Sequence, residues 1–196
     1  MEARVKEKGI LFNAEMVQAI LSGRKTQTRR IISEKTLHLF GVAASAGQCH
    51  PIELCDQRSQ SYYLDFCPLG KPGDQLWVRE AFAAGLCTES TLAYRATHKT
   101  EDLEEGWGET IKWTPSIHMP RWASRINLLI TGVRVERLQD ISDADASAEG
   151  CKISSMQSGE CLSDMFARLW KSIYGDESWQ ANPWVWVINF ERMEAK

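Results

Sequence analysis

The segment Trp184–Phe190 constrains the fold more than any other part of this sequence. It is an uninterrupted run of aromatic and β-branched residues, WVWVINF, and such a run is typical of a buried β-strand. Shorter extended runs occur at Ile10–Phe12, 75–80, 91–96 and 126–138. The chain is therefore expected to build a sheet that contains a buried strand close to its C-terminus.

Three segments are expected to be helical. Met16, Val17, Ile20 and Leu21 recur at helical spacing, Asn13 suits the N-cap, and Gly23 suits the left-handed residue after the last turn. The segment 142–149 resembles a short acidic helix that begins at a serine. A third helix is expected to begin at Ser163 and to end before Gly175.

The remaining segments carry weaker signals. Residues 33–70 show no clear pattern and are predicted to be irregular, and the acidic stretch Glu101–Glu109 is predicted to be a solvated loop. Short strands with three helices, in no regular βαβ alternation, predict the α+β class, with the strands arranged around a small β-barrel. A length of 196 residues fits a single domain, 1–196.

The charge of the chain excludes one class of nucleic-acid protein. Lys and Arg number 23 and Asp and Glu 26, for a formal charge of −3, so a protein that coats nucleic acid through bulk positive charge is excluded. Charge is nevertheless segregated, because residues 1–30 hold seven basic and three acidic residues. A local basic pocket is therefore compatible with the sequence.

Composition also suggests a location and argues against bound groups. The longest apolar stretches fall short of the roughly 20 residues that a membrane-spanning helix needs, and Met1–Gly9 is polar, so we expect a cytoplasmic protein without a membrane anchor. Cys49, His50, Cys55 and Cys67 contain no CxxC pair, so we expect free thiols and neither a metal nor a cofactor.

The most informative motif is the segment 23–30, Gly-Arg-Lys-Thr-Gln-Thr-Arg-Arg, which holds four cations and two threonine hydroxyl groups. It has two interpretations. It is a solvated turn whose positive charge complements a helix C-terminus, or it is the floor of a pocket for an anion or a nucleobase. On a regular strand Lys25 and Thr28 would face opposite sides, so a turn is needed to bring them together.

The spacing Gly23-x-Lys25-x-x-Thr28-x-Arg30 resembles the signature of the ASCH domain family, which belongs to the PUA-like β-barrel superfamily. Gly73-Asp74-x-Leu76-x-Val78 resembles the family's turn into a barrel strand, and Leu138–Gly150 resembles its short acidic helix. The helix at Trp170–Tyr174 and the strand at Val185–Phe190 resemble its closing elements. The resemblance runs across most of the chain and leaves two expected insertions, at about 31–70 and 81–120. Segments such as His118–Trp122 resemble the larger phage and prophage members in particular.

The resemblance implies an amidohydrolase that removes an acyl group from the N4 position of cytidine, with Lys25, Thr28 and Glu149 as catalytic residues. The chemistry is coherent. A threonine hydroxyl needs an adjacent base, a lysine acts as one only if its pKa is lowered, and a carboxylate orients the lysine or protonates the leaving amine. A Lys–Glu contact raises the lysine pKa, which opposes the base role.

Other residues are expected to bind the substrate. Arg and Trp side chains stack on bases and clamp phosphates, and packing is the alternative role of each aromatic residue. The candidates are Arg24, Thr26, Arg29, Arg30, Trp77, Arg79, Glu80, Met119, Arg121, Trp122 and Arg125. The other tryptophans of the expected elements, Trp170, Trp184 and Trp186, are assigned to the core.

Three functions are therefore compatible with the sequence. The first is hydrolysis of an N4-acylated cytidine, as a nucleoside or within RNA. The second is a non-catalytic module that binds RNA or single-stranded DNA, and the third is a ribonuclease that uses the same cleft. The sequence does not indicate an oligomeric state.

Overall fold

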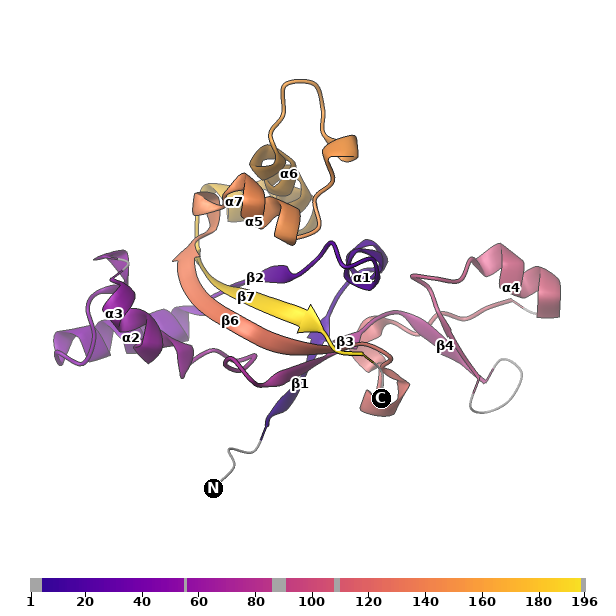
Figure 1. Ribbon diagram of the computed structural model, residues 1–196, viewed down its shortest axis with the longest axis horizontal. Helices are drawn as coiled ribbons and strands as arrows, with labels where there is room; N and C mark the ends of the chain where they lie inside the picture. The colour runs from indigo at the N-terminus through magenta and orange to yellow at the C-terminus, as the bar shows by residue number, and fades with distance from the viewer. Residues whose placement is uncertain (1–4, 55, 86–90, 108–109, 195–196) are drawn as a thin grey trace.

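The chain folds around one curved five-stranded sheet (Figure 1). The computed structural model describes residues 5–54, 56–85, 91–107 and 110–194. The strands lie in the order β1-β3-β6-β7-β2, where β1 pairs with β3 in parallel and all other neighbours are antiparallel. Their bounds are β1 Glu7–Leu11, β2 Gln27–Ile31, β3 Gln75–Arg79, β6 Asn127–Arg137 and β7 Trp184–Arg192.

Strand β7 confirms the buried strand that its composition predicts. It pairs with β6 along one side and with β2 along the other, and residues 184–188 and Phe190 are buried. The expected core roles of Trp170, Trp184 and Trp186 are confirmed, because each is at most 5% exposed. The α+β class is confirmed as well.

The sheet is open, so the expected closed barrel is not found among the described strands. Strands β1 and β2 are its two edges and do not pair with each other. The connection between them explains why. Phe12 packs in the main core directly after β1, helix α1 follows, and the Arg30 side chain of β2 donates to the Leu11 carbonyl across 3.1 Å. The two edge strands are thus linked by a side-chain hydrogen bond, whereas in a closed barrel they would be paired through backbone hydrogen bonds.

Helix α1 (Ala14–Leu21) forms as its signals predict. The Asn13 side chain accepts a hydrogen bond from the Met16 amide, and Gly23 takes a φ of +74° after the last turn. Helix α5 (Asp143–Ala148) begins as expected at Ser142, which accepts from the Asp145 amide. Caps of this kind satisfy donors that the first helical turn leaves free.

Helix α6 (Leu162–Tyr174) begins two residues earlier than expected. Its N-cap is Cys161 and not Ser163, because the Ser163 amide instead donates to the Asp143 side chain of α5. The helix ends at Gly175 as predicted, and the short helix α7 (Asp176–Gln180) follows. Helices α5, α6 and α7 lie together over one face of the sheet (Figure 1).

The prediction of an irregular segment at 33–70 is wrong. It contains helix α2 (Glu34–Ser45), helix α3 (Gln57–Leu64) and the 3-10 turn η1 (Ile52–Leu54). Two features of the sequence explain why its pattern did not predict these helices. Exposed Leu39 and Val42 blur the apolar stripe of α2, and α3 is so polar that only Ser59 and Tyr63 of it are buried.

A smaller unit projects beyond the end of the sheet that lies opposite α2 and α3 (Figure 1). Strands β4 (Phe82–Ala84) and β5 (Leu92–Tyr94) form a two-stranded sheet, and the turns η2 (Ser116–His118) and η3 (Arg121–Ala123) pack beside it. The acidic stretch expected to be a loop forms helix α4 (Thr100–Trp107) over its described residues. Its first turn is acidic, and negative charge stabilises a helix N-terminus.

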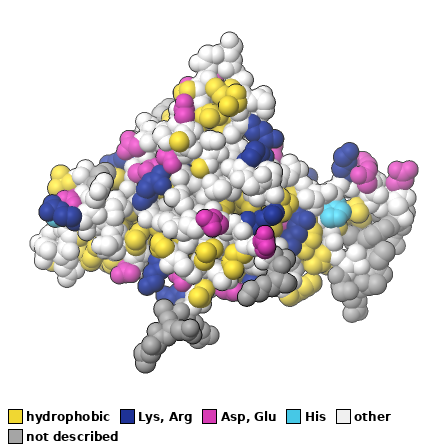
Figure 2. Space-filling model, in the orientation of Figure 1, with side chains coloured by type: hydrophobic (Ala, Val, Ile, Leu, Met, Phe, Trp, Pro, Cys, Tyr) yellow, Lys and Arg dark blue, Asp and Glu magenta, His cyan; other side chains and the backbone are white. Residues whose placement is uncertain are grey.

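Two short turns complete the described structure, η4 (Leu138–Asp140) and η5 (Ile153–Ser155). No helix among the described residues is long and apolar enough to cross a membrane. Basic and acidic side chains are interspersed over the face shown in Figure 2 rather than gathered into one basic surface. On this face the charge distribution differs from that of a protein that coats nucleic acid through its overall positive charge.

Candidate active site

Lys25 and Glu149 form a buried ion pair, although they lie 124 residues apart in the sequence. The Lys25 Nζ donates to Glu149 Oε2 across 2.6 Å, to the Glu149 carbonyl across 2.9 Å and to the Gln27 carbonyl across 2.9 Å. The side chains are 0% and 5% exposed. Three acceptors around one nitrogen match the three protons of an ammonium, so Lys25 is held as a cation.

The chain positions this pair through two helix ends. Lys25 follows the last turn of α1, where its amide donates to the Ala19 carbonyl, and Glu149 is the C-cap of α5. Gly150 has a φ of +100°, and a Cβ there would lie 3.1 Å from the Cβ of Ala19. Glycine is therefore required where the end of α5 passes α1.

Burial lowers the pKa of Lys25 below its ordinary value of 10.5, and the Glu149 carboxylate opposes this shift without cancelling it. The proton on Lys25 is therefore easier to remove than that of an exposed lysine. The nearest carboxylate oxygen is 2.6 Å away, so burial and the contact with Glu149 act on the Lys25 pKa in opposite directions.

Thr28 and Arg30 lie on one face of β2. The Arg30 guanidinium donates to Thr28 Oγ1 across 2.7 Å, and it lies over the Phe12 ring at 5.3 Å. The Lys25 Nζ lies over the same ring at 5.6 Å. Lys25 precedes the strand, so the alternation of side chains along β2 does not place it opposite Thr28.

Arg29 points to the other face of β2 and belongs to a buried polar network. Its guanidinium contacts Glu136 at 2.5 Å, Glu149 at 3.4 Å and Asp145 at 3.5 Å. Arg134 connects the network further, with 2.9 Å contacts to both Glu136 and Asp145. Arg29 thereby links strand β6 and helix α5 to the Glu149 carboxylate, where it contacts Oε1 while Lys25 contacts Oε2.

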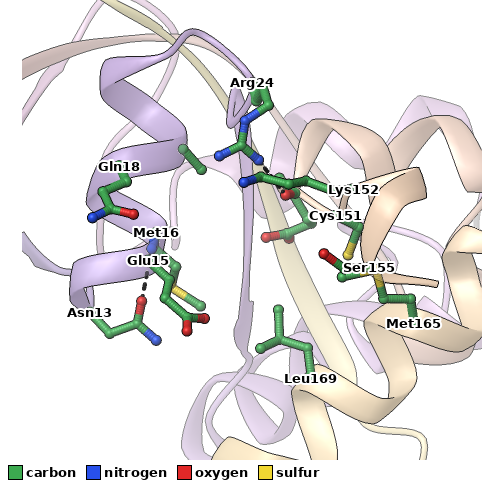
Figure 3. Close-up of a pocket in the computed structure, with 13 residues that line it drawn as sticks. Asn13, Glu15, Met16, Gln18, Arg24, Cys151, Lys152, Ser155, Met165 and Leu169 are labelled. Atoms are coloured by element: carbon green, nitrogen blue, oxygen red, sulfur yellow. Dashed lines mark hydrogen bonds between the residues drawn. The ribbon is translucent and has the colours of Figure 1, made fainter. Parts of the chain in front are cut away.

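Three adjoining cavities form one groove between α1 and α6, called here the α1–α6 groove. All three are lined by Met16. The first, of about 300 Å³, extends from Arg24 and Lys152 to Leu169, and Figure 3 shows α1 on one side of it and α6 on the other. The second, of about 310 Å³, extends from Arg30 to Ile117 and Tyr174. Such volumes suit a small molecule.

The third cavity lies at the floor and is lined by two of the three catalytic candidates, Thr28 and Glu149. Its volume is about 20 Å³, and Thr28, Arg30 and Glu149 line it together with apolar side chains of α6. Roughly 10–15 Å³ suffices for one water molecule. The Glu149 carboxylate lines both this floor and the first cavity, so it is the member of the ion pair that faces the groove.

The first cavity has a polar, partly basic end. Arg24 donates to the Gly150 carbonyl across 3.0 Å and to the Ser22 hydroxyl across 3.1 Å, and exposed Lys152 lies beside it (Figure 3). Glu15 lies lower in the groove on α1. Burial raises the pKa of the Cys151 thiol, which also lines this cavity, to about 11. This thiol is therefore protonated near neutral pH.

Of the expected site residues, Arg24, Thr28, Arg29, Arg30 and Glu149 line the groove, and Lys25 lies directly behind Glu149. Thr26 does not, because it is exposed at the entry to β2, where its amide donates to the Ala148 carbonyl. The other seven expected binding residues, from 77 to 125, line none of the three cavities.

Trp77, Arg79 and Arg121 gather instead at the outer edge of the sheet. The Trp77 ring packs on Gly9 of β1, where a Cβ would lie 2.8 Å from the ring. The two guanidinium groups lie over the indole at 5.4 and 5.9 Å. Arg121 also pairs with Glu7 at 3.1 Å. Arg79 donates to the Ile117 carbonyl, which ties this edge to the far end of the groove.

Glu80, Met119 and Arg125 have structural roles in the smaller unit. Arg125 binds the buried Glu80 carboxylate through two hydrogen bonds of 2.9 and 3.1 Å and lies over the Tyr94 ring at 4.0 Å. Met119 is 1% exposed and packs against Phe82. Trp122, in contrast, is 66% exposed.

Sequence reasoning missed the walls of the groove. Leu169 and Ile173 belong to the apolar stripe of α6, which predicts core packing for the whole stripe, yet both line the groove. Tyr174 and Lys152 belong to no motif that would mark them as site residues in the sequence. Among the described residues no group of three or more His, Cys, Asp and Glu side chains is placed to hold a metal ion, and Cys55 lies outside the described residues.

Comparisons with known proteins assign no family. No protein-family model and no curated protein sequence matches the chain. Among solved structures, it is similar to the hypothetical protein PH0355, with a TM-score of 0.42 and 13% identity over 95% of this chain and 99% of that one. It is also similar to protein EF3133 from Enterococcus faecalis V583, family-model DUF984, with a TM-score of 0.41 and 12% identity over 98% of this chain and 83% of that one.

Proposed function

We propose that this protein is an ASCH-type amidohydrolase that removes the acyl group from an N4-acylated cytidine, as a nucleoside or within RNA, in the α1–α6 groove. One observation carries the proposal. Thr28 and Glu149, which the resemblance names as catalytic, line one small floor although 121 residues separate them, and Lys25, the third residue that it names, contacts Glu149 directly. The two larger cavities of about 300 Å³ give room for a nucleoside on either side of that floor.

The side chains of the floor suit acyl transfer. Glu149 accepts the proton of the Thr28 hydroxyl, whose oxygen attacks the amide carbonyl. The same proton then passes to N4, so that cytidine leaves as the amine and the acyl group stays on Thr28 as an ester. A water molecule, for which the floor has room, adds across the ester and releases the carboxylic acid. Arg30 donates to the developing oxyanion from its place beside Thr28.

The roles of the motif residues are thereby refined. Lys25 donates to three acceptors and its side chain is 0% exposed, so it acts through Glu149 rather than on the substrate. It orients the carboxylate across the 2.6 Å contact. Glu149 is therefore the acid–base group, and Lys25 is a positioning residue.

The experiment that tests the proposal follows cytidine release from N4-acetylcytidine by chromatography. We expect Glu149→Gln to lower kcat by about 10²–10⁴, and Thr28→Val to abolish the ester step. Thr131→Val is the matched control, because Thr131 is exposed on β6 and lines no part of the groove. The same slow rate in wild type and Glu149→Gln would refute the proposed reaction.

Binding of single-stranded RNA without catalysis is the second candidate, and Trp122 favours it. Its side chain is 66% exposed next to Arg121, and an exposed indole beside a cation is a suitable platform for a base. We expect Trp122→Ala to weaken RNA binding about tenfold, as judged by electrophoretic mobility, and Leu54→Ala, which truncates a side chain that is 65% exposed, to leave it unchanged. An affinity that does not fall with rising salt would exclude phosphate contacts.

A further inference from the structure

The two ends of the α1–α6 groove differ in chemistry. The end at Arg24 and Lys152 carries two cations with exposed or half-exposed side chains. The other end is lined mainly by apolar side chains, among them Leu11, Ile117, Ile173 and Tyr174, and its polar members are Asn13, Ser116 and, at the boundary toward the floor, Arg30. One continuous groove therefore has a polar half and an apolar half.

Four large hydrophobic side chains that line the apolar half are exposed to solvent. Leu11 is 44% exposed, Ile117 58%, Ile173 44% and Tyr174 45%. These four side chains come from β1, η2 and α6, which are far apart in the sequence, yet they line one cavity of about 310 Å³. Partly exposed apolar side chains that gather around one cavity suit an apolar ligand.

The position of the catalytic candidates decides what each half holds. Thr28, Arg30 and Glu149 lie at the floor, between the halves. In an N4-acylated cytidine the scissile amide likewise separates a polar base and ribose from an acyl chain. With the amide at the floor, the polar half faces the nucleoside and the apolar half faces the chain beyond the carbonyl.

We propose that the cavity lined by Ile117, Ile173 and Tyr174 is an acyl-chain subsite, and that the preferred substrate carries a long apolar acyl group rather than acetyl. This inference rests on the proposed hydrolase function and adds its specificity. Hydrolysis adds water across the C–N bond, so the acyl carbon gains the hydroxyl, N4 gains the hydrogen, and a fatty carboxylate leaves through the apolar end.

The expected preference follows from burial of the chain. A buried methylene contributes about fourfold in affinity. Hexanoyl has four more methylenes than acetyl, so at half burial we expect kcat/KM for N4-hexanoylcytidine to exceed that for N4-acetylcytidine by about tenfold or more. Ile117→Asn and Ile173→Asn should each reduce this ratio several-fold. Leu54→Asn, which adds the same side chain at an exposed site outside the groove, should leave the ratio unchanged.

Binding of analogues that cannot be hydrolysed separates this inference from the proposed reaction. N4-Hexylcytidine and N4-methylcytidine have no amide, and calorimetric titration of the wild-type protein should show at least tenfold tighter binding of the hexyl compound. If that preference is present but no acylcytidine is hydrolysed, the subsite stands and the proposed reaction fails. If N4-acetylcytidine is hydrolysed but chain length and Ile117→Asn change nothing, the subsite is refuted while the reaction stands. A protein that gives neither preference nor turnover refutes both.

Discussion

The buried Lys25–Glu149 pair predicts a large and specific loss of stability when one partner is removed. Lys25→Met deletes a cation whose side chain is 0% exposed and which donates three hydrogen bonds. Among the described residues the Glu149 carboxylate then keeps Arg29, at 3.4 Å, as its cation. Breaking a buried ion pair in this way costs about 3–5 kcal/mol, and we expect the free energy of unfolding to fall by that amount.

Glu149→Gln should lower the free energy of unfolding by less than Lys25→Met does. The amide oxygen still accepts from the Lys25 ammonium, which also keeps the backbone carbonyls of Gln27 and residue 149, so we expect a loss of about 1–3 kcal/mol. The double variant removes both charges and leaves neither uncompensated. It should therefore be about as stable as Lys25→Met alone, and the coupling energy between the two positions should be about 1–3 kcal/mol.

Urea-induced unfolding at pH 7, followed by circular dichroism and tryptophan fluorescence, measures all three variants. Lys35→Met is the matched control, because Lys35 is exposed on α2, and it should change stability by less than about 0.5 kcal/mol. If the two single losses add in the double variant to within about 0.5 kcal/mol, the charges do not interact. The assignment of Lys25 as the residue that positions Glu149 would then be refuted.

Three further predictions concern single positions. Burial by itself would raise the pKa of Asp145, but hydrogen bonds and a neighbouring arginine outweigh it and hold the pKa at about 2. The stability that this shift contributes is complete above about pH 4 and is lost as pH falls toward 2. In urea titrations Asp145→Asn should therefore reduce the acid-induced loss of unfolding free energy by about 1–2 kcal/mol, and Asp140→Asn, at an exposed side chain, is the matched control. Gly150→Ala, at a φ of +100° with a Cβ contact of 3.1 Å, should lower stability by about 2–3 kcal/mol, and more than Gly159→Ala, which meets no atom within 4 Å. Trp122→Ala, at a side chain 66% exposed, should leave the free energy of unfolding, measured by urea titration, within about 0.5 kcal/mol of wild type.

The elements that the sequence predicted correctly are those whose signals are local. Strand β7 is a continuous β-type run, and α1 has its cap, its apolar stripe and its terminal glycine within 11 residues. In α2 and α3 these signals conflict with tertiary packing. Leu39 and Val42 are apolar but exposed, while Ser59 is polar but buried, where it accepts from the His50 amide. Burial set by other segments overrides a local pattern there.

The candidate site likewise has a part that the sequence could predict, the identity of its residues, and a part that it could not, their geometry. The motif at 23–30 and the resemblance together named Lys25, Thr28 and Glu149, but residue spacing could not give their geometry. The relative placement of Lys25 and Thr28 depends on where β2 begins, and it begins at Gln27. Phe12, which lies under the cations of both Lys25 and Arg30, carries no functional signal in the sequence. Its burial fits the core and the site equally well.

The walls of the groove show why a site of this kind is hard to read from sequence. An amphipathic helix buries one apolar stripe, and the stripe of α6 predicts that every member packs inward. Phe166 and Trp170 do so, at 4% exposure each, whereas Ile173 remains 44% exposed at the mouth of the groove. The same stripe thus contributes Phe166 and Trp170 to the core and Ile173 to the groove. The proposed acyl-chain subsite depends on this second role, because Ile173 and Tyr174 at the end of α6 line it together with Arg30 of the edge strand β2.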